Sequence, residues 1–435
     1  MKKIFKYAFV IFLINLSLVG KAFANEDDEI LKNGLYKAVK DIIDGKLYYQ
    51  INIKTVYGPS DINIYMANTD KDKLSSASTI KLFIGLSVLD KIDKGQMVYT
   101  GKIKRDLDLS LRLSDNDATN RLIEAVGGFE VVNSYIKSFT KNSRTKLNRM
   151  MLSSGEDNTA NAKDLAWALY EIYRNKSELG KDMANSLANS ESKRVKLLKN
   201  INPAYKTFNK TGELNQIQND VALVETKSQA YIISVMTENQ NYMDTYNQIL
   251  LLNKLGAKVA SAYDRYESSY KKRRAGREAK VTAKLNTPEK KLAYAIYKNQ
   301  VFVKAGKILL EANQPNTEEM RTKLIEKIGQ AEATLDQSKK ILAKYSKEKI
   351  TGEEDFTVNL VRLIFTNKDL NSEVDKGLAL AFYKNMAAVK AGEILLNESP
   401  KTSLNIRRPL LKNIKESEAV FDNMEKIFDK LNAEN

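Results

Sequence analysis

The sequence of 435 residues contains no cysteine and no histidine. Without cysteine, the chain has no disulfides, no thiol nucleophile, no zinc–thiolate site and no lipidated N-terminal cysteine. Without histidine, it has no Ser-His-Asp triad and no imidazole ligand for a metal. If the chain is an enzyme, its general base must therefore be a lysine, an aspartate, a glutamate or a tyrosine.

The remaining composition is ordinary for a globular protein, with 43% hydrophobic and 29% charged residues. Such a chain can bury a sizeable core, and its length favours two or three domains. No spacing of acidic residues indicates a metal site, and no motif indicates an organic cofactor. We therefore expect neither.

The first 24 residues have the pattern of a secretory signal. Three lysines (Lys2, Lys3 and Lys6) precede an apolar run at residues 7–19, and Ala22-Phe23-Ala24 supplies a small-x-small cleavage pattern. The alternative is an N-terminal membrane anchor, but the apolar run is short for a bilayer, and no later stretch approaches a membrane span. We expect cleavage before Asn25 and export to the periplasm, the cell envelope or the medium.

Positive charge is concentrated in the C-terminal part of the chain. The whole sequence carries a formal charge of +16, of which residues 251–435 contribute +10 and residues 25–250 only +2. Export argues against nucleic acid as a partner. A basic surface would attract an anionic envelope polymer or lipid headgroups, while the plainer interpretation is a solvated helix face.

Residues 25–265 are predicted to form one α+β domain. Alternating apolar and polar residues favour strands, and helical spacing of apolar residues favours helices, with a closing helix at 250–270. The expected strands lie at 45–66, 220–224 and 230–236, and the expected helices at 78–91, 119–126, 130–138 and 161–173. The only tryptophan, Trp167, is expected to pack in the core.

The last third of the chain contains an internal repeat with an offset of 86 residues. Tyr297-Lys298-Asn299 recurs as Tyr383-Lys384-Asn385, and Val303–Gly306 recurs as Val389–Gly392. Each copy, at about 291–345 and 377–431, is predicted to be a pair of amphipathic helices, the first starting at Thr287-Pro288. Residues 291–435 therefore form an expected all-α domain of helical hairpins, behind a basic linker at 266–290.

Three short strings in the first domain carry chemistry. A Ser-x-x-Lys string at Ser78–Lys81 opens a predicted helix, Ser114-Asp115-Asn116 follows, and Lys210-Thr211-Gly212 precedes strand-like sequence. The Ser-x-x-Lys spacing alone is weak, because it also occurs elsewhere in the chain, for example at Ser134–Lys137, Ser138–Lys141 and Ser269–Lys272. All three strings in this order and context are a strong signal.

These strings resemble those of the serine β-lactamase and penicillin-binding protein superfamily, in its class A-like branch. The resemblance covers about residues 30–260 and does not reach the helical repeats. It implies an antiparallel sheet flanked by helices, and an active-site serine acylated by β-lactams or D-Ala-D-Ala-type peptides of the peptidoglycan kind.

Elementary chemistry supports this interpretation. A serine hydroxyl needs a neighbour that takes its proton, and Lys81 lies one helical turn after Ser78. Burial and a second cation, Lys210, would lower the pKa of Lys81 and free a neutral amine as base. Ser114 can relay the proton to the leaving nitrogen, and Asn116 can hold the substrate amide.

The third string is expected to hold the substrate. Lys210 and Thr211 can bind its carboxylate, while Gly212 and Glu213 continue the same segment. The resemblance implies an oxyanion hole formed by the backbone N–H groups of Ser78 and Glu213. Asp115 is expected to cap a helix rather than to act as a catalytic acid.

The sequence also departs from the family pattern. Class A enzymes use a glutamate to activate the deacylating water, and the loop after Thr145–Arg149 has Met151 at that position. Glu156 is the nearest carboxylate, and the loop is shortened. The strand at 228–231 lacks the arginine often found there. We therefore expect a long-lived acyl-enzyme; the alternative is an envelope-binding scaffold protein with a weak or inactive hydrolase domain.

Overall fold

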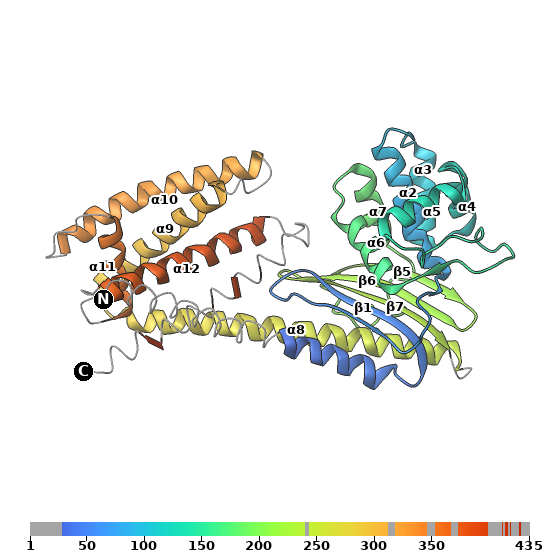
Figure 1. Ribbon diagram of the computed structural model, residues 1–435, viewed down its shortest axis with the longest axis horizontal. Helices are drawn as coiled ribbons and strands as arrows, with labels where there is room; N and C mark the ends of the chain where they lie inside the picture. Colours follow the sequence, from blue (N-terminus) through green and yellow to red (C-terminus); the bar gives the residue numbers. More distant parts are fainter. Residues whose placement is uncertain are drawn as a thin grey trace, which may run out of the picture. The chain divides into compact units, whose positions relative to one another are not determined.

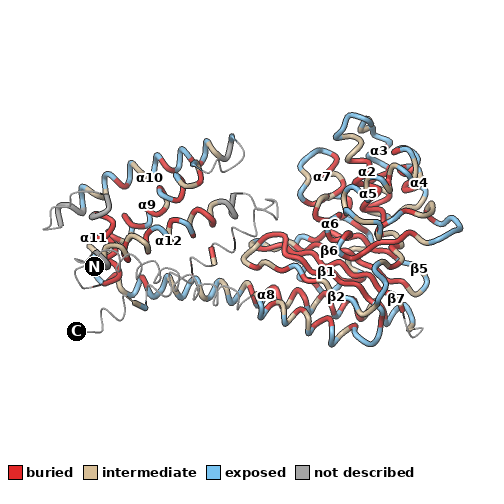
Figure 2. The backbone as a smooth tube through the Cα atoms, viewed as in Figure 1, coloured by how far each residue is buried: buried red, intermediate tan, exposed pale blue. Residues whose placement is uncertain are grey.

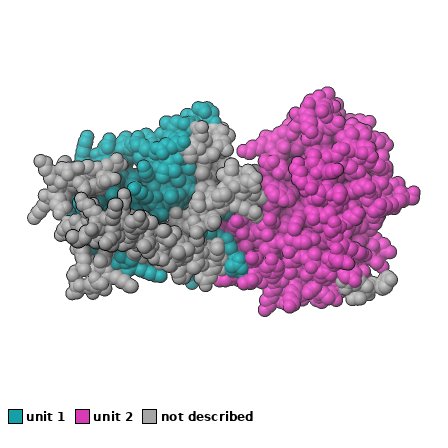
Figure 3. Space-filling view, viewed as in Figure 1, with its two compact units in different colours: residues 1–29, 268–435 teal, residues 30–267 magenta. Residues whose placement is uncertain are grey.

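A computed structural model describes residues 28–239, 243–311, 318–345, 353–366 and 373–398, and six single residues nearer the C-terminus. The expected signal at 1–24 lies outside the described residues. The chain divides into two compact units, residues 30–267 and residues 1–29 with 268–435 (Figure 3). We describe each unit by itself.

The first unit is built on a five-stranded antiparallel sheet with the strand order β2-β1-β7-β6-β5. Its strands are β1 (Leu47–Tyr57), β2 (Asn63–Ala67), β5 (Lys206–Leu214), β6 (Ile217–Glu225) and β7 (Ala230–Asn239). The central strands are buried along nearly their whole length (Figure 2), because helices cover both faces of the sheet. This arrangement confirms the predicted α+β class.

One face of the sheet is covered by two helices from opposite ends of the unit. The helix at residues 28–42 and the first half of α8 (Thr245–Lys284) lie side by side against it (Figure 1). Their apolar side chains, such as Leu35 and Val259, share one core with the strands. Tyr263 of α8 stacks flat on Tyr231 of β7, with ring centroids 3.9 Å apart.

The other face is covered by a group of helices between β2 and β5. These are α2 (Lys81–Asp93), α3 (Gly101–Asp108), α4 (Asn116–Ala125), α5 (Phe129–Thr140), α6 (Ala162–Arg174) and α7 (Glu178–Ala188). Polar side chains cap four of them, from Thr100, Asp115, Asn161 and Ser177. The predicted cap role of Asp115 is confirmed by its bond from the Ala118 N–H, at 2.7 Å.

One local prediction in this unit is wrong. Trp167 is not in the core, since 39% of it is exposed. Its ring instead faces the buried Lys54 amine, 3.0 Å from the ring centroid, so the indole shields a cation. The string Lys210–Gly212 itself lies inside β5, and the strand-like sequence that it was predicted to precede is β6.

The second unit is helical throughout its described residues. It contains the end of α8, then α9 (Pro288–Glu311), α10 (Glu318–Tyr345), α11 (Glu353–Phe365) and α12 (Glu373–Glu398). A shift of 86 residues carries α9 onto 374–397, within one residue of the bounds of α12. Gly306 lets α10 approach α9 closely, because an added Cβ would lie 2.5 Å from the Ile328 side chain.

The basic segment expected as a linker is helical as far as Lys284. Residues 266–284 continue α8 because no proline interrupts the chain before Pro288. Two of its arginines form ion pairs within the unit, Arg274 with Glu393 and Arg277 with Glu418 at 3.2 Å. Among the helices described here, none is long and apolar enough to cross a membrane.

Candidate active site

Ser78 lies in a short 3-10 turn, η1 (Ala77–Ile80), that leads into α2. The turn is fixed from several sides: the Ser76 N–H donates to the Asn158 carbonyl oxygen at 2.7 Å, and Thr79 Oγ1 donates to the Ser76 carbonyl oxygen at 2.6 Å. Ala77 has a φ of +46°, a strained value for a residue with a side chain. Strain of this kind is common where a fold holds a reactive group in place.

Lys81 follows one turn after Ser78 and is fully buried. Its amine donates to Ser114 O at 2.5 Å, to Asn116 Oδ1 at 2.9 Å and to Ser114 Oγ at 3.2 Å. Burial lowers the pKa of Lys81 to about 8, against the opposing effect of Asp115. A substantial fraction of this amine is therefore neutral just above neutral pH.

Ser114 links the first and the third string. It follows a π-helical turn, Leu109–Leu113, and has a left-handed φ of +61°. Its hydroxyl oxygen accepts from the Lys210 amine at 2.9 Å as well as from Lys81. Because one hydroxyl oxygen joins two lysine amines, Ser114 is placed to pass a proton between a lysine and a third group.

Lys210 points from β5 into the same cluster and is fully buried. Besides Ser114, its amine donates to the Thr211 carbonyl oxygen at 3.0 Å. Burial lowers the pKa of Lys210 to about 7, with a further contribution from the nearby cations Lys81 and Lys196. Protonation of Lys210 therefore disfavours protonation of Lys81, and the reverse also holds.

Gly212 brings β5 against the nucleophile turn. An added Cβ would lie 2.8 Å from the Ser76 carbonyl oxygen and 3.1 Å from the Ser78 nitrogen. Only glycine allows this approach, which sets the backbone of residues 212–213 beside that of Ser78. The neighbouring Thr211 donates through Oγ1 to Ser192 Oγ at 2.9 Å.

The structure thus brings Lys81, Ser114, Asn116 and Lys210 into one hydrogen-bonded cluster, with Ser78 on the turn that precedes Lys81. The Ser78 hydroxyl is half-buried and forms no hydrogen bond within the described residues. In this state the Lys81 amine bonds to Ser114 and Asn116 instead. Such contacts are often loose before substrate binds.

Sequence reasoning missed two buried charged groups beside the cluster, Lys196 and Asp220. Lys196 stands in a basic run that looks like surface, yet it is fully buried, and its amine lies 3.1 Å from Glu213 Oε1. The Asp220 carboxylate accepts from the Leu197 N–H at 3.1 Å and from Asn209 Nδ2 at 3.0 Å. Burial raises the pKa of Asp220 to about 6.

The loop that carries Met151 is short and closed by an ion pair between Arg149 and Asp157, at 2.7 Å. Asn120 of α4 holds the Met151 backbone, accepting from its N–H at 2.8 Å and donating to its carbonyl oxygen at 3.3 Å. Met151 itself is 8% exposed, whereas Glu156 is exposed. The loop therefore presents an apolar residue at its anchored position and its carboxylate to solvent.

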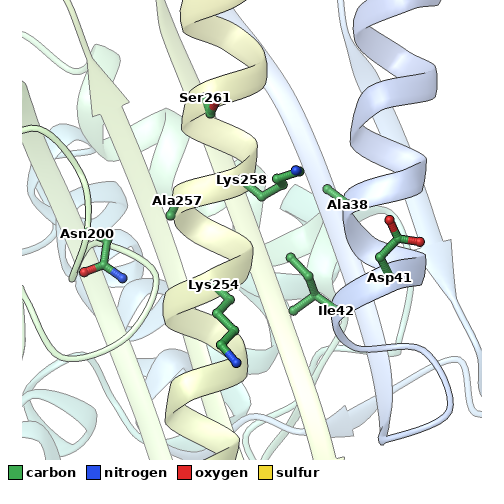
Figure 4. Close-up of a pocket in the computed structure, with 8 residues that line it drawn as sticks. All are labelled: Ala38, Asp41, Ile42, Asn200, Lys254, Ala257, Lys258 and Ser261. Atoms are coloured by element: carbon green, nitrogen blue, oxygen red, sulfur yellow. The ribbon is translucent and has the colours of Figure 1, made fainter.

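No predicted site residue lines the groove of about 420 Å³ between the helix at 28–42 and α8 (Figure 4). Its charged side chains are the exposed Asp41, Lys254 and Lys258. Among the described residues, no group of three acidic side chains could hold a metal ion.

Comparison with known families identifies the first unit. Residues 102–265 match Beta-lactamase2, described as the beta-lactamase enzyme family. The match includes Ser114–Asn116 and Lys210–Gly212, and it begins after Ser78 and Lys81. The predicted resemblance is therefore confirmed for residues 102–265. No curated protein matches the chain.

Solved structures of the same kind are similar over about half of the chain. A beta-lactamase from Sphaerobacter thermophilus is 21% identical with a TM-score of 0.45, covering 53% of this chain and 97% of its own. A class A beta-lactamase from Mycobacterium abscessus is 16% identical (TM-score 0.45, covering 54% and 99%). A point mutant of PBP-A, as an acyl-enzyme complex with penicillin-G, is 17% identical (TM-score 0.47, covering 54% and 97%).

Proposed function

We propose that the first unit is an exported active-site-serine enzyme, acylated at Ser78 by β-lactams or by D-Ala-D-Ala-type peptides, with slow deacylation. The observation that carries this proposal is the bonded series Lys81–Ser114–Lys210, with Lys81 one turn after Ser78. A histidine-free chain needs such a base, and the low pKa of Lys81 makes its neutral form available near neutral pH.

Acylation then proceeds in balanced steps. Ser78 Oγ attacks the substrate carbonyl carbon, and its proton passes to the neutral Lys81 amine. The N–H groups of Ser78 and Glu213 receive the developing oxyanion. As the C–N bond breaks, Ser114 donates its proton to the leaving nitrogen and regains one from Lys81 or Lys210, both within hydrogen-bond distance. Lys210 and Thr211 bind the substrate carboxylate, and Asn116 binds its amide.

Deacylation lacks an evident base. The thioether of Met151 cannot accept a proton from water, and Glu156 is exposed on the short loop. We therefore propose that the acyl-enzyme persists, as expected for a penicillin-binding enzyme rather than for an efficient β-lactamase.

Labelling with a fluorescent penicillin tests the proposal. The mature protein is incubated with the probe and separated under denaturing conditions, and Ser78→Ala serves as the control. We expect covalent fluorescence on the wild type that persists for many minutes and none on the variant. Equal label on both proteins, or label that clears within seconds, would refute the proposed nucleophile or the proposed slow deacylation, respectively.

A second function, binding in the cell envelope, is favoured by the basic segment near the end of α8. Lys271, Lys272 and Lys280 are exposed in it, in the part of the chain that carries most of the net charge. We propose an anionic envelope polymer or a protein as the partner of the helical unit. Sedimentation with purified cell walls at low and high salt tests it, and binding that does not weaken with salt would contradict an electrostatic contact.

A further inference from the structure

Three fully buried lysines, Lys81, Lys196 and Lys210, gather around β5, and few carboxylates face them. Asp220 on β6 is buried, Glu213 on β5 has a half-exposed side chain, and Asp115 at the start of α4 acts on Lys81 alone. Three ammonium groups in a region of low dielectric constant repel one another, so simultaneous protonation of all three is disfavoured. The cluster must distribute its protons among the lysines unequally.

The contacts of the three amines show which one is best able to remain charged. The Lys196 amine donates to the carbonyl oxygens of Gly212 (3.3 Å) and Asn219 (3.2 Å), and it lies 3.1 Å from Glu213 Oε1. These contacts give an oxygen to each of its three N–H donors, and one of the three is a carboxylate. The amines of Lys81 and Lys210 contact only neutral oxygens.

We propose that Lys196 is a positioning residue for the acylation reaction and acts through its charge. By remaining protonated beside Gly212, it disfavours further protons on Lys210 and Lys81, so Lys81 is free to take the proton of Ser78. Lys196 needs no contact with the substrate for this role. The effect on acylation rests on the proposed function, whereas the effect on the protonation of the lysines rests only on the contacts of their amines.

The proton affinity of the cluster agrees with this assignment. Burial lowers the pKa of Lys210 to about 7, and the cations Lys81 and Lys196 add to the effect, while Asp220 and Glu213 oppose it. Burial also lowers the pKa of Lys196, but both carboxylates, Glu213 and Asp220, oppose that shift. Removing the charge at Lys196 should therefore raise the pKa of the remaining lysines, which then hold their protons to higher pH.

The pH dependence of acylation tests the proposal in two variants of the full chain. In Lys196→Met, the midpoint at which the labelling rate rises should move up by about 0.5–1 pH unit, the size expected for one charge several ångströms away at an effective dielectric constant of about 20. Easier protonation of Asp220 offsets part of the shift. Labelling should fall about three- to tenfold at pH 7 and recover at pH 9.

Lys196→Arg is the matched control, because it keeps the charge and should leave the midpoint in place. A loss of rate in Lys196→Met that is equal at every pH would overturn the proposal and leave Lys196 a structural residue. An upward shift in Lys196→Arg as large as that in Lys196→Met would overturn it too.

A second measurement does not depend on activity. Protein labelled with ¹³C at the lysine ε-carbons is titrated by NMR, with the Lys210 signal identified by its loss in Lys210→Arg. The Lys210 midpoint should rise in Lys196→Met, and an unchanged midpoint would overturn the proposal. If penicillin labels no form of the protein, the proposed function fails, whereas this titration still decides whether Lys196 controls the protons of the cluster.

Discussion

The two units of the chain treat buried and half-buried charge in opposite ways. In the helical unit, cations lie beside carboxylates, in pairs such as Arg277–Glu418 and Lys307–Glu332. In the first unit, by contrast, the buried lysines Lys196 and Lys210 share Asp220 and Glu213, and the buried Lys81 is near Asp115. Matched charges stabilise a packing arrangement, while unmatched charges lower the pKa of a lysine and produce a base.

The two copies of the helical repeat keep cations beside carboxylates at corresponding positions in different ways. In the first copy, Lys307 forms an ion pair with Glu332 at 2.8 Å. The corresponding residues of the second copy, 86 positions later, are Glu393 and Glu418. Both shifted residues are acidic, and two arginines of α8 supply the missing cations. The basic run therefore serves the packing of the helical unit as well as its net charge.

The largest expected effect comes from removing the proposed base. Lys81→Met should lower the acylation rate by about 10²–10⁴-fold, the usual contribution of a general base, because no other neutral amine lies one turn from Ser78. Stopped-flow labelling with penicillin measures the rate. Far-UV circular dichroism checks that the variant is folded, and a folded variant with an unchanged rate would rule out Lys81 as the base.

Restoring a carboxylate to the short loop should have the next largest effect. In Met151→Glu, release of the acyl group should accelerate by about 10²-fold, since the Asn120 contacts fix this backbone against α4, the helix that begins at Asn116. Decay of the intact-mass adduct measures the rate, with Met151→Gln as the control that adds no base. Equal decay in both variants would show that residue 151 does not reach the deacylating water.

The acylation rate of the wild type should increase with pH. The reactive form of the Lys81 amine is neutral, so protonation of Lys81 below its pKa of about 8 should suppress the rate. We expect labelling to rise about tenfold per pH unit below this pKa and to level off above it. A rate that is flat from pH 5 to pH 9 would contradict a lysine base.

The smallest effect should come from breaking a matched pair. Glu418→Gln leaves Arg277 without its carboxylate at a site where Glu418 is 10% exposed, and should cost the helical unit about 1–3 kcal/mol of unfolding free energy. Lys307→Met removes a pair that is about half exposed and should cost less than about 1 kcal/mol. Urea denaturation compares the two, and neither variant should change acylation.

The sequence predicted the parts of the first unit that depend on short-range patterns. The strands and the helix after Ser78 follow from apolar spacing, and the three strings located the lysine–serine cluster. Lys196 could not be recognised, because its burial depends on β5 and β6, which lie after it in the chain. Trp167 was assigned to the core on hydrophobicity alone, whereas a buried lysine determines its position.

The helical unit was less predictable. The repeat indicated α9, and the start at Pro288 is confirmed, but the basic residues after Tyr270 suggested a linker. They are helical because their partners Glu393 and Glu418 come more than a hundred residues later, a long-range pairing that no local pattern reveals.

Peptide mapping after reaction with penicillin shows which residue is acylated and whether Lys81 activates it. The wild-type protein is treated at pH 8, digested and analysed by mass spectrometry, and the same is done with Lys81→Met. We expect one adduct per chain on the peptide that contains Ser78, and almost none in the variant at equal times. An adduct on another residue, or equal modification of both proteins, would contradict a serine activated by a buried neutral lysine.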